Sequence, residues 1–220
     1  MTQHQASDDP TLGLFSDVPA GIPRIEEWAG IVPGAPDDRY GDLIANLRSF
    51  LDHVAAARPE PAMVAELADQ LSAWCDRLAP TAVSEHDQFF ARRFELPDRG
   101  QSLPPTFIPH DATRDRVSGT TRFGRYFLGG NGAVHGGAIP LLFDEVLGWL
   151  AGSDGRSACR TAYLHTDYRA ITPIGPELQV DAWFESEEGR KRFVRGTLTH
   201  EGTVCAEVQG LFIALKPGQP

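Results

Sequence analysis

One short stretch of this chain combines residue types that could do chemistry. His135, Gly136 and Gly137 stand together, and Asp144 follows nine residues after the histidine. A carboxylate can take up a proton or attack an electrophilic carbon, and glycines let a ligand approach the backbone closely. Amides at the start of a helix have no partner inside it and lie at the positive end of its dipole. The stretch therefore predicts a site that stabilises a developing negative charge.

Residues 137–151 predict the helix that carries this acid, because Pro140 lacks the amide that would bond to the carbonyl of Gly136. Its apolar residues form a stripe within about 60° on the helical wheel, and the opposite side is also mostly apolar. Such a helix is expected to be buried on all sides. We expect Asp144 in the interior and Glu145 solvated or ion-paired, since buried carboxylates are costly unless paired or used. The stripe consists of Ile139, Leu142, Phe143, Val146 and Leu150.

The segments around this helix predict an antiparallel sheet. Runs rich in β-branched and aromatic residues indicate strands, and residues 187–189 and 201–202 are typical of hairpin turns. A buried helix followed by antiparallel strands predicts an α+β fold in which the sheet wraps around the helix. The strands are expected at residues 106–109, 116–123, 161–170, 178–185, 192–200 and 204–215.

The chain divides into three regions. Residues 1–36 are rich in Pro, Gly and Asp and predict an extended, partly disordered arm. Residues 37–100 predict a helical hairpin and a linker, because apolar residues recur at helical spacing on both sides of Pro59 and Pro61. We expect the hairpin to pack against the core, with a lid or a dimerisation element as the alternative. Residues 101–220 form the predicted α+β domain.

Composition argues against several classes of protein. A net charge of −10 makes nucleic acid an unexpected partner, and no run of about 18 apolar residues predicts a membrane helix. Cys75, Cys159 and Cys205 are scattered, which argues against a disulfide framework or a metal site and favours a cytoplasmic location. The first residues lack the apolar segment of a secretory signal. No Gly-x-Ser-x-Gly, phosphate-binding loop or dinucleotide motif occurs.

Three motifs carry a resemblance to a known family. They are Val134-His135-Gly136-Gly137-Ala138-Ile139 followed by Asp144, the segment 161–168, and Gly189-Arg190-Lys191. Together they resemble the hotdog-fold acyl-CoA thioesterases, in the PaaI-like and THEM4-like branch of the 4HBT superfamily. The resemblance implies a hotdog fold, an antiparallel sheet around one long central helix, preceded here by a helical extension. It also implies a hydrolase of fatty acid metabolism that releases a carboxylic acid and coenzyme A, with no cofactor beyond the coenzyme A of its substrate.

The resemblance assigns roles within the site. Asp144 is the general base or the nucleophile, two alternatives that stay open. The amide of Gly136 is the oxyanion donor, and Gly137 relieves crowding on the substrate side. His135 orients the thioester carbonyl or fixes the turn. Thr161 positions the water or holds Asp144.

Other residues are expected on the substrate side. Arg160 and Arg190, followed by Lys191, are the cations expected to bind the phosphates of coenzyme A. Many relatives have an asparagine six residues before the motif histidine, where this chain has Gly129. Asn131 is the nearest asparagine, and it is a substrate-side or a turn residue. Three apolar residues of the helix are expected either to line a tunnel for the acyl chain or to pack in the core. They are Phe143, Leu147 and Trp149.

The length of the helix predicts a site shared between subunits. Gly136 and Asp144 are about 12 Å apart along a helix axis, so one thioester cannot touch both in a single chain. An antiparallel second copy would bring Asp144 opposite the other subunit's Gly136, and we expect a homodimer or a tetramer of dimers. The alternatives are a hotdog dehydratase or hydratase acting on acyl carrier protein or enoyl-CoA substrates, and a non-catalytic acyl-CoA binding or sensing module.

Overall fold

The computed structural model describes residues 39–93, 96, 98–153 and 155–219, and the predicted arm lies outside them. Two helices come first, α2 (Tyr40–Ala56) and α3 (Pro61–Leu78), followed by the 3-10 turn η1 (Ala79–Thr81). They lie where the two helical patterns were expected. None of the described helices has the length and apolar character needed to cross a membrane.

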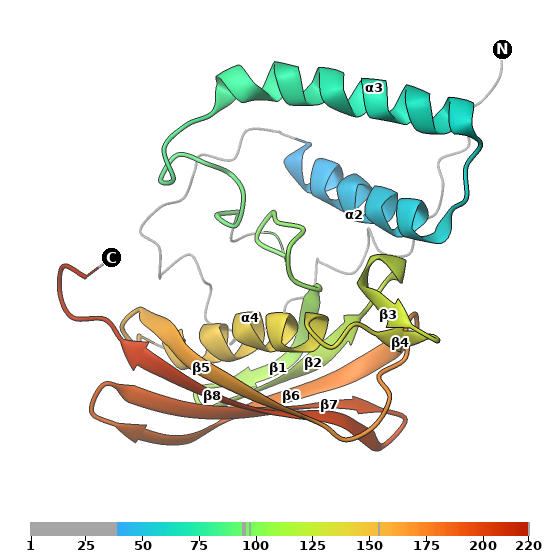
Figure 1. Cartoon of the computed structure of the whole chain (residues 1–220). Helices are drawn as coiled ribbons and strands as arrows, with labels where there is room; N and C mark the ends of the chain where they lie inside the picture. Colours follow the sequence, from blue (N-terminus) through green and yellow to red (C-terminus); the bar gives the residue numbers. More distant parts are fainter. Residues whose placement is uncertain (1–38, 94–95, 97, 154, 220) are drawn as a thin grey trace, which may run out of the picture.

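The second half of the chain forms a six-stranded antiparallel sheet with one helix, α4 (Ala138–Gly152), on its concave face (Figure 1). The strand order is β1-β2-β6-β7-β8-β5, so β1 and β5 form the two edges. The strands are β1 (Phe107–Thr113), β2 (Arg116–Arg122), β5 (Cys159–Tyr168), β6 (Glu177–Glu188), β7 (Lys191–His200) and β8 (Thr203–Ala214). Between β2 and α4 lie η2 (Arg125–Phe127) and a small ladder of β3 (Leu128–Gly130) with β4 (Ala133–Val134).

The predicted α+β architecture, a sheet around one central helix with a helical region before it, is confirmed. One predicted turn is wrong. β6 continues through Glu188, which pairs with Lys191, so the hairpin turn is Gly189-Arg190 and does not include residues 187–188. Gly189 has a φ of 60°, which suits the first position of a two-residue hairpin turn.

The core lies between α4 and the sheet, and two residues of β7 fix the helix there. Gly196 allows the ring of Phe143 to lie directly on the strand, because a Cβ at this position would collide with that ring. Arg192 is buried and donates to the carbonyl of Ala151 at 2.8 Å and to that of Ser157 at 2.7 Å. These bonds satisfy a carbonyl that the end of a helix leaves without a partner.

The prediction that α4 is buried on all sides is wrong for the single chain. The sheet covers one side of the helix and buries the predicted stripe. On the other side Asp144 is exposed and Trp149 is half-buried. The linker before β1 covers part of this side, where Arg99 and Gln101 bond to Glu145. A sheet can cover only one side of a helix, so the apolar residues of the far side need another cover.

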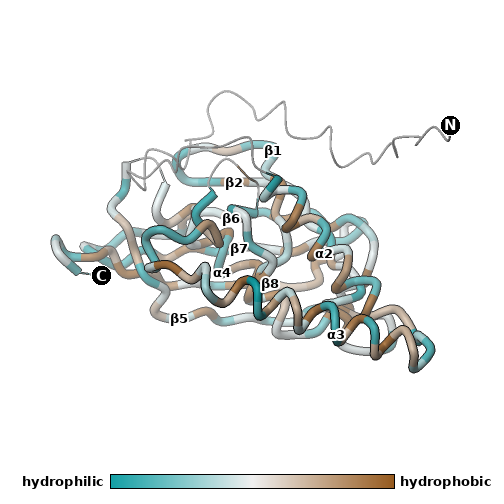
Figure 2. The backbone as a smooth tube through the Cα atoms, turned by 90° about the horizontal axis from the view of Figure 1, so that it is seen from above, coloured by the Kyte–Doolittle hydropathy of each residue, from teal (hydrophilic) through white to brown (hydrophobic). Residues whose placement is uncertain are grey.

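The helical hairpin does not pack against this core as expected. α3 has no buried residue, and α2 buries Ile44 alone. Both helices lie on the side of α4 that faces away from the sheet (Figure 1). Seen from above, α3 lies over the β5 side of the sheet and not over the β1 side (Figure 2).

Candidate active site

The start of α4 forms the corner that the sequence predicts as an anion site. Gly137 is the N-cap residue, and no side chain caps the helix. Its amide donates to Nδ1 of His135 at 3.0 Å, and the amide of Ala138 donates to the His135 carbonyl at 2.9 Å. Gly136 is exposed, and its amide has no acceptor among the described residues. Because Gly136 is exposed, its amide is open to a ligand at this corner.

The bond from Gly137 also determines the tautomer of a neutral His135 ring. Because Nδ1 accepts the amide proton, the ring carries its own proton on Nε2. The ring is exposed, so Nε2–H is available as a second donor. One histidine thus holds the turn through one nitrogen and offers a hydrogen bond through the other.

Tyr168 on β5 is a residue of this corner that sequence reasoning missed. Its hydroxyl donates to the carbonyl of Gly136 at 2.7 Å. The bond anchors the residue whose amide is free, so that the amide keeps one direction. No local sequence pattern indicates this pair, because the two residues are 32 positions apart and come together only in the folded chain.

Helix α2 supports the corner from behind. The amide of His135 donates to the carbonyl of Phe127 at 2.7 Å, and the amide of Tyr126 donates to the carboxylate of Asp52 at 2.8 Å. Gly124 permits this approach, because a Cβ there would collide with the carboxylate of Asp52. The N-terminal region is thereby joined to the corner at the start of α4 through η2.

The missing asparagine of the family has a structural reason. A Cβ at Gly129 would lie 2.8 Å from the Cα of His135, so a side chain at this position does not fit without movement of the backbone. Asn131 occupies the turn between β3 and β4 with a φ of 49°, a left-handed conformation that asparagine tolerates. Its position is that of a turn residue.

Asp144 and Glu145 differ in their surroundings. Asp144 is exposed and accepts a hydrogen bond of 2.7 Å from the hydroxyl of Thr161 on β5. Glu145 turns to the linker, where it pairs with Arg99 and accepts a bond of 3.4 Å from Gln101. Burial raises the pKa of Glu145, Arg99 opposes the rise, and Asp144 adds to it. The expected ion pairing of Glu145 is confirmed, whereas an interior position for Asp144 is wrong in the single chain.

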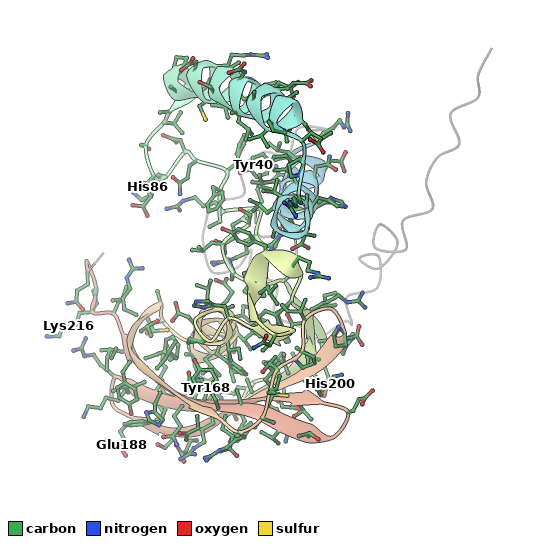
Figure 3. The ribbon with its side chains drawn as sticks, turned by 45° about the vertical axis from the view of Figure 1, so that its right-hand side comes forward. Tyr40, His86, Tyr168, Glu188, His200 and Lys216 are labelled. Atoms are coloured by element: carbon green, nitrogen blue, oxygen red, sulfur yellow. The ribbon has the colours of Figure 1, made fainter. Side chains whose placement is uncertain are left out.

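The structure separates the expected phosphate-binding cations. Arg160 precedes Thr161 on β5, is exposed, and makes no ion pair within the described part of the chain. Arg190 and Lys191 lie at the β6–β7 hairpin beside the last turn of α4, and Arg190 donates to the carbonyl of Ala214 at 3.0 Å. Figure 3 shows this hairpin, marked by Glu188, at the opposite end of the sheet from His200.

That hairpin is far from the start of α4 in its own chain. Tyr168 lies beside Ala206, which pairs with Leu198, seven residues along β7 from Lys191. Seven residues of strand span about 23 Å. Arg190 and Lys191 therefore do not meet Gly136 within one subunit.

The remaining expectations concern the lining of the site and a metal. Phe143 and Leu147 are fully buried core residues, so they do not line an open tunnel. A cavity of about 110 Å³ lies between α2 and η2, lined in part by Arg48, Asp52 and Arg122, and it includes none of the predicted site residues. Within the described ranges no three His, Cys, Asp or Glu side chains gather as metal ligands would.

Comparisons with known proteins agree with this geometry. Residues 131–207 match the model of the thioesterase superfamily, 4HBT. The chain is 37% identical over 99 residues to the acyl-coenzyme A thioesterase THEM4 of Rattus norvegicus, which covers 44% of this chain and 42% of that protein. The same protein of Bos taurus is 32% identical over 96 residues, or 43% of this chain and 39% of the relative. The match thus spans less than half the length of these relatives.

A solved structure shows a wider likeness. The crystal structure of RHA08564, a thioesterase superfamily protein, matches with a TM-score of 0.67 and 26% identity over 83% of this chain and 97% of that one. The segment from the β3–β4 turn to β8 therefore matches the thioesterase superfamily, and the fold is the hotdog fold.

Proposed function

We propose that this chain hydrolyses acyl-CoA thioesters to a free carboxylic acid and coenzyme A. The observation that carries the proposal is the free amide of Gly136 at the start of the helix that also bears Asp144. An amide in this position stabilises the oxyanion that forms when a thioester carbon is attacked. The relatives named as acyl-coenzyme A thioesterases support this choice of substrate. The three free cysteines fit a cytoplasmic location.

The chemistry uses the groups of the corner and of β5. A water oxygen attacks the thioester carbon and gives a proton to Asp144, and the intermediate then expels sulfur, which takes up that proton. Thr161 occupies Oδ1 of Asp144, so Oδ2 is left for the water. The amide of Gly136 and Nε2–H of His135 donate to the carbonyl oxygen. In the alternative, Oδ2 attacks the carbon itself and water releases the acid afterwards.

A second copy of the chain completes the site. Gly136 and Asp144 are about 12 Å apart along the helix, and Asp144 lies open on the side away from the sheet. A two-fold partner with an antiparallel α4 would place the Asp144 of one copy opposite the Gly136 of the other. The same symmetry would bring Arg190 and Lys191 of one copy to the corner of its partner. Arg160, beside Thr161, is the third cation for the coenzyme A phosphates.

The two sheet edges differ in a way that favours pairing at β5. Both edge strands have one irregularity in register, β1 between Pro109 and Asp111 and β5 between Thr161 and Tyr163. β1 also contains Pro109, which has no amide to donate to a further strand. β5 has ten residues without proline and is paired on one side with β8. A continuous sheet across β5 would bring two copies of Thr161 and Tyr168 to the dimer interface.

The test is a series of acyl-CoA esters of increasing chain length, with released coenzyme A measured by a thiol reagent. A blank without substrate corrects for the exposed Cys75. We expect turnover by the native chain and a loss of about 10²–10⁴-fold in kcat for Asp144→Asn, with substrate still bound. Bound substrate without release of coenzyme A would instead identify a binding module. Without coenzyme A release, loss of the absorbance of an enoyl-CoA would identify a hydratase, and gain of enoyl absorbance from a hydroxyacyl thioester would identify a dehydratase.

A further inference from the structure

Helix α3 carries an apolar face that the other described residues leave open. The α3 stripe consists of five residues at alternating intervals of three and four, the spacing of a coiled-coil seam. They lie within about 60° of one direction on the helical wheel. Four of them are 48–60% exposed: Val64, Leu71, Trp74 and Leu78, with Leu67 as the fifth member.

The acidic residues of α3 lie away from this stripe. Glu66, Asp69 and Asp76 are at about 140–160° from Leu71 on the wheel. Residues that flank the stripe, such as Ala68 and Cys75, are uncharged. One cation, Arg77, lies beside the stripe, with its guanidinium group over the ring of Trp74 at 4.0 Å from the centroid. The stripe therefore suits an apolar protein surface on which no carboxylate is buried.

The residues that the structure describes do not cover the stripe. On α2, Leu43 is 56% and Val54 is 51% exposed, so the two helices of the hairpin do not bury each other's apolar residues. The exposed large apolar residues in the described part of the chain lie at positions 43–103 and 126–171, and none is on β1, β2, β6, β7 or β8. The uncovered apolar surface is thus concentrated on the helical extension and around the β5 edge, the side over which α3 lies (Figure 2).

We propose that the α3 stripe packs on a second copy of this chain, so that each subunit of the dimer covers the α3 stripe of the other. This inference rests on the two-fold dimer of the proposed function, because a copy added across the β5 edge lies on the side of α3. The two-fold axis makes the exchange reciprocal, and both stripes are buried at once. A contiguous row of exposed apolar side chains indicates an interaction surface.

The first test is the dimer dissociation constant of the full chain, measured by sedimentation over a range of concentrations. Leu71→Glu places a charge in the stripe, whereas Ala73→Glu places the same charge on the opposite face of α3. We expect the dissociation constant to rise at least tenfold for Leu71→Glu and to change less than twofold for Ala73→Glu. We expect both variants to fold, since α3 buries no residue in the single chain. Circular dichroism of each variant checks this.

The second test needs no change in the stripe. Cys75 flanks it and is exposed in the single chain, so its labelling by a thiol reagent reports whether α3 is covered, with Cys75→Ser identifying its signal. We expect slow labelling above the dissociation constant and fast labelling below it. Protection at every concentration would mean that α3 packs within its own chain and would overturn the proposal.

Two further outcomes separate this proposal from the shared active site. A native dimer with fast labelling of Cys75 and no effect of Leu71→Glu would overturn the exchange of α3 and leave the shared site intact. A native chain that is monomeric at all concentrations would overturn both.

Discussion

Tyr168 on β5 donates its hydroxyl to the carbonyl oxygen of Gly136 at 2.7 Å, across 32 positions of sequence. Gly136 is also the residue whose amide is left open at the start of α4. The edge strand thus holds the direction of the amide that the proposed chemistry needs. Tyr168 is a positioning residue in this scheme, since it acts through Gly136.

Replacement of Tyr168 by phenylalanine should lower kcat/KM by about 3–10-fold, the worth of one hydrogen bond of roughly 0.5–1.5 kcal/mol. The melting temperature should change little, because Tyr168 is 55% exposed. Tyr163→Phe is the matched control, since this tyrosine lies on the same strand and is 47% exposed. Equal losses in the two variants would show that the bond to Gly136 is not the cause.

The bond from Thr161 to Asp144 predicts a second pair of variants. Thr161→Val removes the hydroxyl and should lower kcat by about tenfold, because the carboxylate is no longer held toward the water. Thr161→Ser keeps the hydroxyl and should stay within about threefold of the native rate. Steady-state kinetics with one acyl-CoA ester measures both. A serine variant as slow as the valine variant would contradict the role of the hydroxyl.

The support of the corner by α2 predicts an effect of a distant residue. Asp52→Ala removes the acceptor of the Tyr126 amide and should destabilise the chain by roughly 1–2 kcal/mol, which lowers the melting temperature by about 2–8 °C. We also expect lower kcat/KM, since η2 carries the carbonyl that binds His135. Asp42→Ala is the control, because Asp42 is exposed and pairs with Arg39 on the surface. Full activity of Asp52→Ala after correction for the folded fraction would argue against this support.

The raised pKa of Glu145 predicts a pH dependence of stability. Because burial favours the protonated form, the folded chain binds this proton more tightly than the unfolded one. The stabilising contribution is full below the ordinary pKa of 4.5 and is lost as the pH rises through the raised value. Glu145→Gln removes the titration and keeps an acceptor for Gln101. The melting temperature of this variant minus that of the native chain should therefore rise with pH. The rise should be about 2–4 °C for each kcal/mol of unfolding free energy that the native chain loses.

Melting curves at several pH values between the ordinary and the raised pKa test this expectation. Glu66→Gln on the outer face of α3 is the control, since its carboxylate is exposed. A difference between the Glu145 variant and the native chain that falls with rising pH would mean that the pair with Arg99 outweighs the burial.

Much of this molecule follows from local pattern. The period of the apolar residues predicted α2, α3 and α4, because side-chain spacing reflects which face of a helix is covered. Runs of β-branched and aromatic residues predicted the strands of the sheet. Unpartnered amides at the start of α4 followed from Pro140 and the helix start, which are local properties of the backbone, and the family resemblance named Gly136 as the donor. The ion pairing of Glu145 followed from the cost of an unpaired carboxylate on an apolar helix.

Contacts between distant segments were decided by the tertiary structure alone. Whether Asp144 is exposed depends on what lies over the far side of α4, and a helical wheel shows apolar character without showing which element covers it. The partnership of Tyr168 with Gly136 and the support of η2 by Asp52 arise only when β5 and α2 reach the same corner. The packing of α3 was mistaken for the same reason: an apolar stripe determines that a helix needs a partner, and only the folded arrangement decides whether its own chain supplies one.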